Sequence, residues 1–299
     1  MQVAVRAHPV APEFHEPPSC PYYKYPSGAS SPYGDQAMVL LRSIAAAGEL
    51  QPTHFETSLA EFAREYPLRT PPGRLDNATK QFAKNVAEGR RWPHCGAEDS
   101  QAISLTKVAL LACRYTGAEL RDKCEAATRV HQNNDDAVLY ALASAALLER
   151  AILGSSPREA LQGAAPLMHE SARRCVSRAQ QAAAQPLAEL LTQLGSELFA
   201  DSEHAEMMGR SAALPCAFIA PCRSLLSDST YTNVVRENMV GGGDSCVRAM
   251  LLGAVAAAAG GLDSIPVSWR SKTEAYGEAL ALAVQLAEHR TEGSGVGDV

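Results

Sequence analysis

The turn at residues 241–246, with the sequence GGGDSC, has the residue types best suited to chemistry in this chain. Its three glycines permit left-handed backbone conformations that other residues resist. Asp244 then stands at the N-cap position of the apolar helix that follows. Aspartate is a frequent N-cap, so a purely structural role is one interpretation. The other is a carboxylate at the mouth of a pocket, where it would suit a hard cation such as Mg²⁺.

A phosphate-binding loop is a further alternative for this turn, because a glycine-rich loop at a helix N-terminus can hold a phosphate. The turn lacks the pattern GxxxxGK[ST], however, and its carboxylate would repel an anion. Between the two ligand classes, the residues favour a cation.

A second segment, residues 31–38 (SPYGDQAM), repeats the arrangement of an aspartate after a glycine at a helix start. By itself Asp35 is best explained as a helix cap. If the two helices that begin with aspartates converge at one end of a bundle, however, Asp35 and Asp244 would form an oxygen site with two carboxylates.

Two further polar segments are candidates for a ligand-binding rim. Residues 129–136 (RVHQNNDD) precede an apolar helix and predict either a solvated loop with a cap or a rim on which His131 or Gln132 faces a polar ligand. Residues 96–101 (GAEDSQ), which include Asp99, give a weaker signal of the same kind.

The elements that must position these residues are predicted to be helices. Hydrophobic residues make up 46% of the chain but aromatic residues only 6%, so the core must be built from Ala, Leu and Val. This composition favours closely packed helices over a sheet, and we expect an all-α fold. Helix starts are predicted by four capping-box patterns and by single caps, at Thr53–Glu56, Thr116–Glu119, Ser156–Glu159, Ser271–Glu274, Asp76 and either Asn134 or Asp135.

The predicted organisation is a single helical domain with irregular ends. Residues 1–34 form a proline-rich extended arm, residues 35–290 the helical domain, and residues 291–299 a disordered tail. No segment has the composition of an interdomain linker.

Charge, hydropathy and cysteine spacing exclude several classes of protein. The net charge is −6 and no Lys/Arg-rich run occurs, which argues against nucleic acid as a partner. The longest run of small apolar residues, 249–261, is too short for a membrane span, and the N-terminus lacks the apolar core of a signal peptide. The eight cysteines form no CxxC pair, which argues against zinc or a disulfide framework. We expect a cytoplasmic protein with no membrane partner.

Three segments in this order resemble the ADP-ribosylglycohydrolase family, and within it the crystallin J1-like branch. They are residues 18–35 (PSCPYYKYPSGASSPYGD), 129–137 (RVHQNNDDA) and 242–269 (GGDSCVRAMLLGAVAAAAGG, followed by IPVSW). The resemblance implies an all-α multi-helix bundle. Active members hold two Mg²⁺ ions and hydrolyse the glycosidic bond that joins ADP-ribose to a protein side chain.

The same resemblance places the family's metal-binding motifs on this chain. A Thr-Asp-Asp-Thr segment falls on residues 33–36 and a Gly-Gly-Asp-x-Asp segment on residues 242–246. Gly34 and Cys246 therefore stand where two of the four aspartates are expected. A Thr-His motif of the substrate cleft falls on residues 131–132, so that its histidine becomes Gln132. The family's opening helix is expected to be lacking.

From the resemblance, Asp35 and Asp244 are the expected metal ligands, for one weakly held Mg²⁺ ion or none. Asp35 is the candidate for orienting an attacking water. Gln132, Asp99, Ser245 and Gly243 are expected to bind the substrate.

Two functions remain open. The first is hydrolysis or binding of an ADP-ribose-like molecule, or of an ADP-ribosylated protein, at a degenerate site. The alternative is a catalytically inactive, crystallin J1-like structural or binding protein, which self-association could complete.

Overall fold

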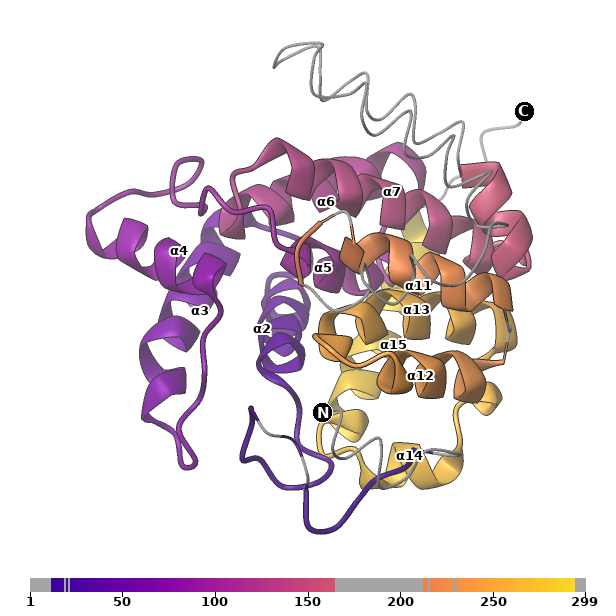
Figure 1. Cartoon of the computed structure of the whole chain (residues 1–299). Helices are drawn as coiled ribbons and strands as arrows, with labels where there is room; N and C mark the ends of the chain where they lie inside the picture. The colour runs from indigo at the N-terminus through magenta and orange to yellow at the C-terminus, as the bar shows by residue number, and fades with distance from the viewer. Residues whose placement is uncertain are drawn as a thin grey trace.

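The computed structural model describes residues 12–164 and 212–293, apart from residues 19, 21, 215, 228 and 229. The described residues form helices joined by loops (Figure 1), and none of them lies in a β-strand. Their only extended pairings are two isolated β-bridges, Ala97 with Gln132 and Gln101 with Ala213. The predicted all-α, multi-helix fold is confirmed.

The first half of the chain supplies two groups of helices. Helices α3 and α4 pack beside α2 on one side of the molecule, while α5, α6 and α7 pack together on another (Figure 1). Their bounds are α2 Pro32–Ala47, α3 Pro52–Glu65, η1 Tyr66–Leu68, α4 Asn77–Ala87, η2 Ala102–Ser104, α5 Leu105–Ala112, α6 Gly117–His131 and α7 Asp135–Ile152.

The second half forms the remaining side of the bundle, with α13 packed against α5, α7, α11 and α12. The bounds of its helices are α11 Cys216–Ser227, α12 Tyr231–Val240, α13 Ser245–Gly260, η3 Leu262–Ser264, α14 Val267–Lys272 and α15 Tyr276–Gly293. Helix α15 returns to α2, so that the last described helix packs on the first.

Helices α7 and α13 lie in the middle because they are apolar nearly all round. The core they share with α2 and α5 is built from Ala, Leu and Val, and only a few rings such as Phe55, Phe82 and Phe218 are fully buried. The predicted aliphatic core is confirmed.

The predicted caps divide into those that form and those that do not. Asp76 and Asn134 accept hydrogen bonds from backbone N–H groups of α4 and α7, and Ser156 and Glu159 form the predicted capping box. Gln51 rather than Thr53 is the N-cap of α3. Thr116 is the N-cap of α6, so this predicted helix start is confirmed, although its side chain makes no cap bond. The box predicted at Ser271 is wrong, because α14 ends just after this residue.

The structure shifts both predicted domain limits by a few residues. Helix α2 begins at Pro32 because Ser31 caps it, and α15 continues to Gly293, three residues into the predicted tail. Residues 1–11 of the predicted arm and 294–299 of the predicted tail lie outside the described residues.

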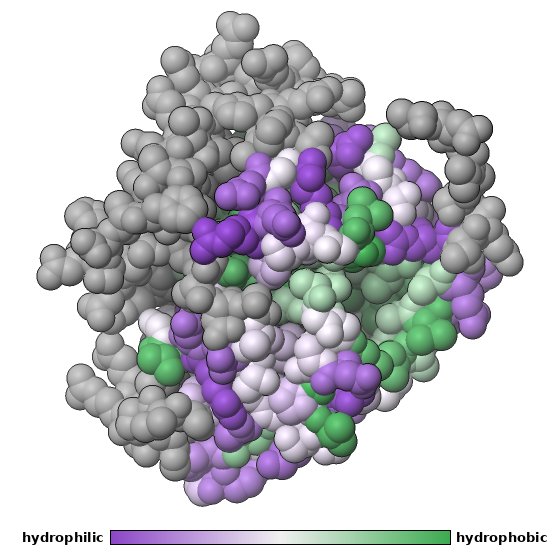
Figure 2. Space-filling model, turned by 90° about the vertical axis from the view of Figure 1, so that its right-hand side faces the viewer, coloured by the Kyte–Doolittle hydropathy of each residue, from purple (hydrophilic) through white to green (hydrophobic). Residues whose placement is uncertain are grey.

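The described part of the arm lies against the C-terminal helices. The Glu13 carboxylate accepts hydrogen bonds from Arg236 on α12 and Trp269 on α14. Figure 2 shows the face that includes this side of the molecule, where hydrophobic side chains form separate groups among polar ones. No helix among the described residues is long and apolar enough to cross a membrane.

Candidate functional site

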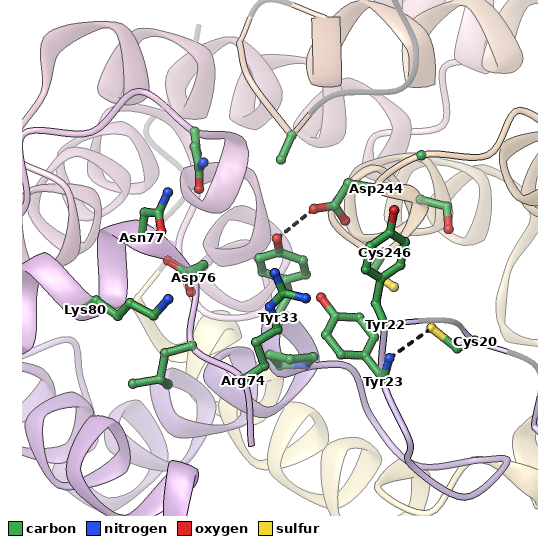
Figure 3. A pocket seen from close by; sticks show the side chains of 16 residues that line it. Cys20, Tyr22, Tyr23, Tyr33, Arg74, Asp76, Asn77, Lys80, Asp244 and Cys246 are labelled. Atoms are coloured by element: carbon green, nitrogen blue, oxygen red, sulfur yellow. Dashed lines mark hydrogen bonds between the residues drawn. The ribbon is translucent and has the colours of Figure 1, made fainter. Parts of the chain in front are cut away.

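A cavity of ≈ 350 Å³ lies where the arm, α2, α4 and the turn before α13 meet (Figure 3). The side chains that line it include two carboxylates, two cations and three tyrosines. These are Asp76, Asp244, Arg74, Lys80, Tyr22, Tyr23 and Tyr33, and the turn adds Gly243, Ser245 and Cys246.

Asp244 occupies the N-cap position of α13, but its side chain does not cap the helix. Its Oδ2 instead accepts a hydrogen bond of 2.7 Å from the Tyr33 hydroxyl. Gly242 and Gly243 make this possible with φ angles of 69° and 66°, which residues with a Cβ rarely adopt. Asp244 is therefore a carboxylate on the cavity wall, as the second interpretation of this turn predicted.

Buried side chains fix the turn from beneath. Arg248 is 2% exposed and donates from Nε to the Asn238 side-chain oxygen at 2.9 Å and from Nη2 to the Gly242 carbonyl. The Asn238 amide in turn donates to the Ser245 carbonyl at 2.9 Å. Because a buried guanidinium strongly resists losing its acceptors, these bonds hold the backbone on both sides of Asp244.

Asp35 is directed elsewhere. It lies in the first turn of α2, where its Oδ2 accepts hydrogen bonds from the Tyr66 hydroxyl at 2.7 Å and from Arg69 at 2.8 Å. Residues two apart on a helix do not face each other, and Tyr33 already reaches Asp244. Asp35 therefore does not line the cavity, and the structure does not bring Asp35 and Asp244 together as the two-carboxylate hypothesis required.

Gln132 and Asp99 do not line the cavity either. Gln132 is completely buried, and its side-chain amide donates to the carbonyls of Gln101 at 2.8 Å and Asp99 at 2.9 Å. The Asp99 carboxylate accepts from the Gln101 backbone N–H at 2.8 Å. These contacts fix a loop from which only Gln101 reaches the cavity. The Gln132 Nε2 donates to backbone carbonyls of this loop, whereas its buried Oε1 has no hydrogen-bond partner among the described residues.

Sequence reasoning identified Asp76 only as a helix cap, but its carboxylate also lines the cavity. It accepts three hydrogen bonds: the cap bond from the Thr79 backbone N–H at 2.8 Å, and bonds from the Thr79 hydroxyl at 2.6 Å and the Gln36 side-chain amide at 2.7 Å. Burial acts to raise the pKa of Asp76, but the nearby His131 and these hydrogen bonds lower it below its usual value.

A buried hydrogen-bonded chain runs inward from Asp76. The Thr79 hydroxyl donates to Asp76, so it accepts from His131 Nε2 at 2.9 Å, which leaves His131 Nδ1 to accept from Lys107 Nζ at 3.3 Å. Burial lowers the pKa of His131 to about 3, and Lys107 adds to this shift. Burial also lowers the pKa of Lys107 to about 7, although Asp76 opposes it. His131 is thus an interior group and does not face a ligand.

Cys246 lines the cavity beside Asp244, at a position where the family resemblance expects an aspartate. Burial raises the pKa of its thiol to about 11, and the negative charge of Asp244 contributes. The thiol is therefore protonated at neutral pH, and a thiol is a poor ligand for Mg²⁺.

These donors do not fit a centre with two cations. Asp35 is paired with Arg69, Gly34 has no side chain and Cys246 is a neutral thiol. Within residues 12–164 and 212–293, no three His, Cys, Asp or Glu side chains are grouped so that they could hold a metal ion. Asp244, with one oxygen bonded to Tyr33, is left as a single carboxylate on this wall.

Comparisons with known proteins identify the family. The family model described as ADP-ribosylglycohydrolase matches residues 3–295. The chain belongs to the ADP-ribosylglycohydrolase family. Two crystallins of Tripedalia cystophora are relatives: crystallin J1A is 25% identical over 289 residues, covering 93% of this chain and 85% of the crystallin, and crystallin J1B is 26% identical over 288 residues, covering 92% and 84%.

A solved structure also shares the fold of this ADP-ribosylglycohydrolase family member. It is described as an ADP-ribosylglycohydrolase-related protein complex, and it superposes with a TM-score of 0.65 at 19% identity. The match covers 89% of this chain and 84% of that one. The predicted family, its crystallin J1-like branch and its fold are confirmed.

Proposed function

We propose that this chain binds an ADP-ribose-like ligand in the cavity beneath the arm, with Asp244 as the anchoring carboxylate. The observation that carries the proposal is the orientation of Asp244. An N-cap aspartate that does not cap its helix leaves a backbone donor without its usual partner, and here the carboxylate faces a polar cavity instead. Membership of the ADP-ribosylglycohydrolase family supports ADP-ribose as the class of ligand.

The chemistry of the cavity suits the ribose of such a ligand. Among the described residues, only Tyr33 donates a hydrogen bond to Asp244, at Oδ2, and a carboxylate has about four acceptor positions. A ribose cis-diol can donate two hydrogen bonds to the remaining positions. Because Tyr33 and the buried Arg248 fix the wall, little conformational entropy is lost when the ligand binds.

A single Mg²⁺ ion is the most that the donors support. Mg²⁺ can bind through one carboxylate while it keeps several waters, and Asp244 would hold it with the neighbouring Ser245 hydroxyl at hand. Bound there, the ion would supply a Lewis acid close to the ribose. Hydrolysis that needs two cations is disfavoured by this donor set, and Asp35, which is paired with Arg69, receives no catalytic role in the proposal.

The second candidate function is a structural or binding role without catalysis. The two relatives at 25% and 26% identity are crystallins by name, and two expected metal-binding carboxylates are replaced by Gly34 and Cys246. Self-association and a cytoplasmic location remain predictions from the sequence.

Isothermal titration with ADP-ribose, with and without Mg²⁺, tests the proposal. We expect wild type to bind ADP-ribose and Asp244→Asn to bind about tenfold more weakly, because one charged acceptor is lost. Asp35→Asn is the matched control: it removes a carboxylate from another helix start, outside the cavity, and should leave ligand affinity unchanged.

Equal affinity of wild type and Asp244→Asn would overturn the assigned role of this residue. Absence of binding to wild type at millimolar ligand would favour the structural function. Release of ADP-ribose from an ADP-ribosylated protein, followed over time, measures whether any hydrolysis accompanies binding.

A further inference from the structure

The two cations of the cavity both come from the segment that leads into α4. Arg74 lies two residues before the N-cap Asp76, and Lys80 lies one helical turn after it. Figure 3 shows Lys80, Asp76 and Asn77 on one side of the cavity, Asp244 and Cys246 on the other, and Arg74 between them. Lys80 thus lies on the α4 side, and Arg74 lies between that side and the turn that carries Asp244 (Figure 3).

Neither cation has an ion-pair partner among the described residues. Their neighbours in the chain do: Arg69 pairs with Asp35, and Lys84, one turn beyond Lys80, reaches Glu88. Asp76, which lines the same cavity, already accepts three hydrogen bonds from Thr79 and Gln36. Arg74 and Lys80 therefore line the same cavity as Asp76 and Asp244 without forming an ion pair with either carboxylate.

The position of Arg74 is set by the fold rather than by chance exposure. Its backbone N–H donates to the Tyr25 hydroxyl at 3.3 Å, so the arm holds this residue at the cavity. Tyr25 is in turn buried and stacked on Tyr23, with ring centroids 5.5 Å apart. Tyr22, which precedes Tyr23 in the arm, is 64% exposed and also lines the cavity.

We infer that Arg74 and Lys80 form an anion subsite that binds the phosphate groups of a phosphorylated ribose while its diol reaches Asp244. The inference rests on the proposed function and adds a direction to it: the phosphates lie toward α4 and the ribose toward α13. The planar guanidinium of Arg74 can donate two hydrogen bonds to phosphate oxygens, and Lys80 adds a second charge.

The test uses titrations of the full chain with three probes: ADP-ribose, inorganic pyrophosphate and adenosine. The variants are Arg74→Gln, Lys80→Gln and the double variant, with Lys84→Gln as a control on the same helix but outside the cavity. All three side chains are exposed, so circular dichroism should find the variants folded. We expect each cavity substitution to weaken ADP-ribose binding about tenfold, while Lys84→Gln has no effect.

Two further measurements show whether the substitutions act by removing positive charge or by changing the shape of the cavity. Wild type should lose ADP-ribose affinity as the salt concentration rises, and this dependence should be shallower in the double variant, because fewer charges contact the ligand. Pyrophosphate should compete with ADP-ribose in wild type. Adenosine, which lacks phosphate, should bind wild type and the double variant equally.

The outcomes distinguish this inference from the function on which it rests. If the double variant binds ADP-ribose as tightly as wild type, the anion subsite is overturned and the proposed function stands. If wild type binds pyrophosphate but not ADP-ribose, and the double variant binds neither, the subsite stands and the proposed function is overturned. If wild type binds neither probe, both are overturned.

Discussion

Asp76 and Asp244 are two aspartates at helix N-caps that line one cavity, yet their surroundings differ. Asp76 caps α4, accepts bonds from Gln36 and Thr79, and is backed by a buried chain that ends at Lys107. The Asp244 side chain does not cap α13, and within the described part of the chain it accepts one hydrogen bond, from Tyr33. A carboxylate whose acceptor positions are filled from within the protein stabilises the fold, whereas one with open positions is available to a ligand.

The largest effect that follows from this comparison is on stability. Asp76→Ala should lower the free energy of unfolding by about 3 kcal/mol, because it removes a helix cap and leaves buried donors of Gln36 and Thr79 without partners. Asp244→Ala should lower it by only about 1 kcal/mol, because a single hydrogen bond is lost. Urea unfolding of the two variants measures the difference, and equal losses would contradict the distinction between them.

The next effect concerns pH and the buried chain behind Asp76. Lys107 loses its proton near pH 7 in the folded protein but near 10.5 when unfolded. Between these values the unfolded state binds more protons, so this lysine makes the free energy of unfolding rise with pH, and it contributes no slope below about pH 7. Relative to Lys107→Met, the free energy of unfolding of wild type should rise by about 1.4 kcal/mol per pH unit above pH 7.

Urea unfolding at several pH values between 6 and 9 checks this slope, at constant ionic strength. Lys84→Met removes an exposed lysine and should show no such dependence. If the free energies of unfolding of wild type and Lys107→Met differ by a constant amount from pH 7 to 9, Lys107 remains charged in the folded protein.

The smallest effect tests the bond between Tyr33 and Asp244. Burial and the nearby Asp244 raise the pKa of Tyr33, so the phenol remains a donor at neutral pH. Tyr33→Phe should weaken ADP-ribose binding about fivefold, because the carboxylate loses the group that orients it. Tyr66→Phe is the matched control: it removes the corresponding donor to Asp35 and should leave ligand affinity unchanged. Equal affinities of the two variants would show that Asp244 needs no such support.

Prediction from the sequence succeeded where the signal is local. Helix α7 is recognised from its Asn134 cap and continuous apolar run, and the turn before α13 from its glycines and Asp244. It failed where two segments distant in the chain had to be placed together. Gln132 was expected on a rim, yet it is buried and its side-chain nitrogen donates to the carbonyls of Asp99 and Gln101.

The sequence by itself determined the all-α class, the aliphatic core and the family, because composition, helical periodicity and ordered motifs do not depend on tertiary contacts. Only the tertiary structure decided which aspartate faces the cavity. On α2 the residues two apart, Tyr33 and Asp35, point in different directions, so Tyr33 reaches Asp244 while Asp35 is paired with Arg69. The tertiary structure also decided that Arg74 and Lys80 share that cavity with Asp244, because their placement depends on how the start of α4 packs toward the turn before α13.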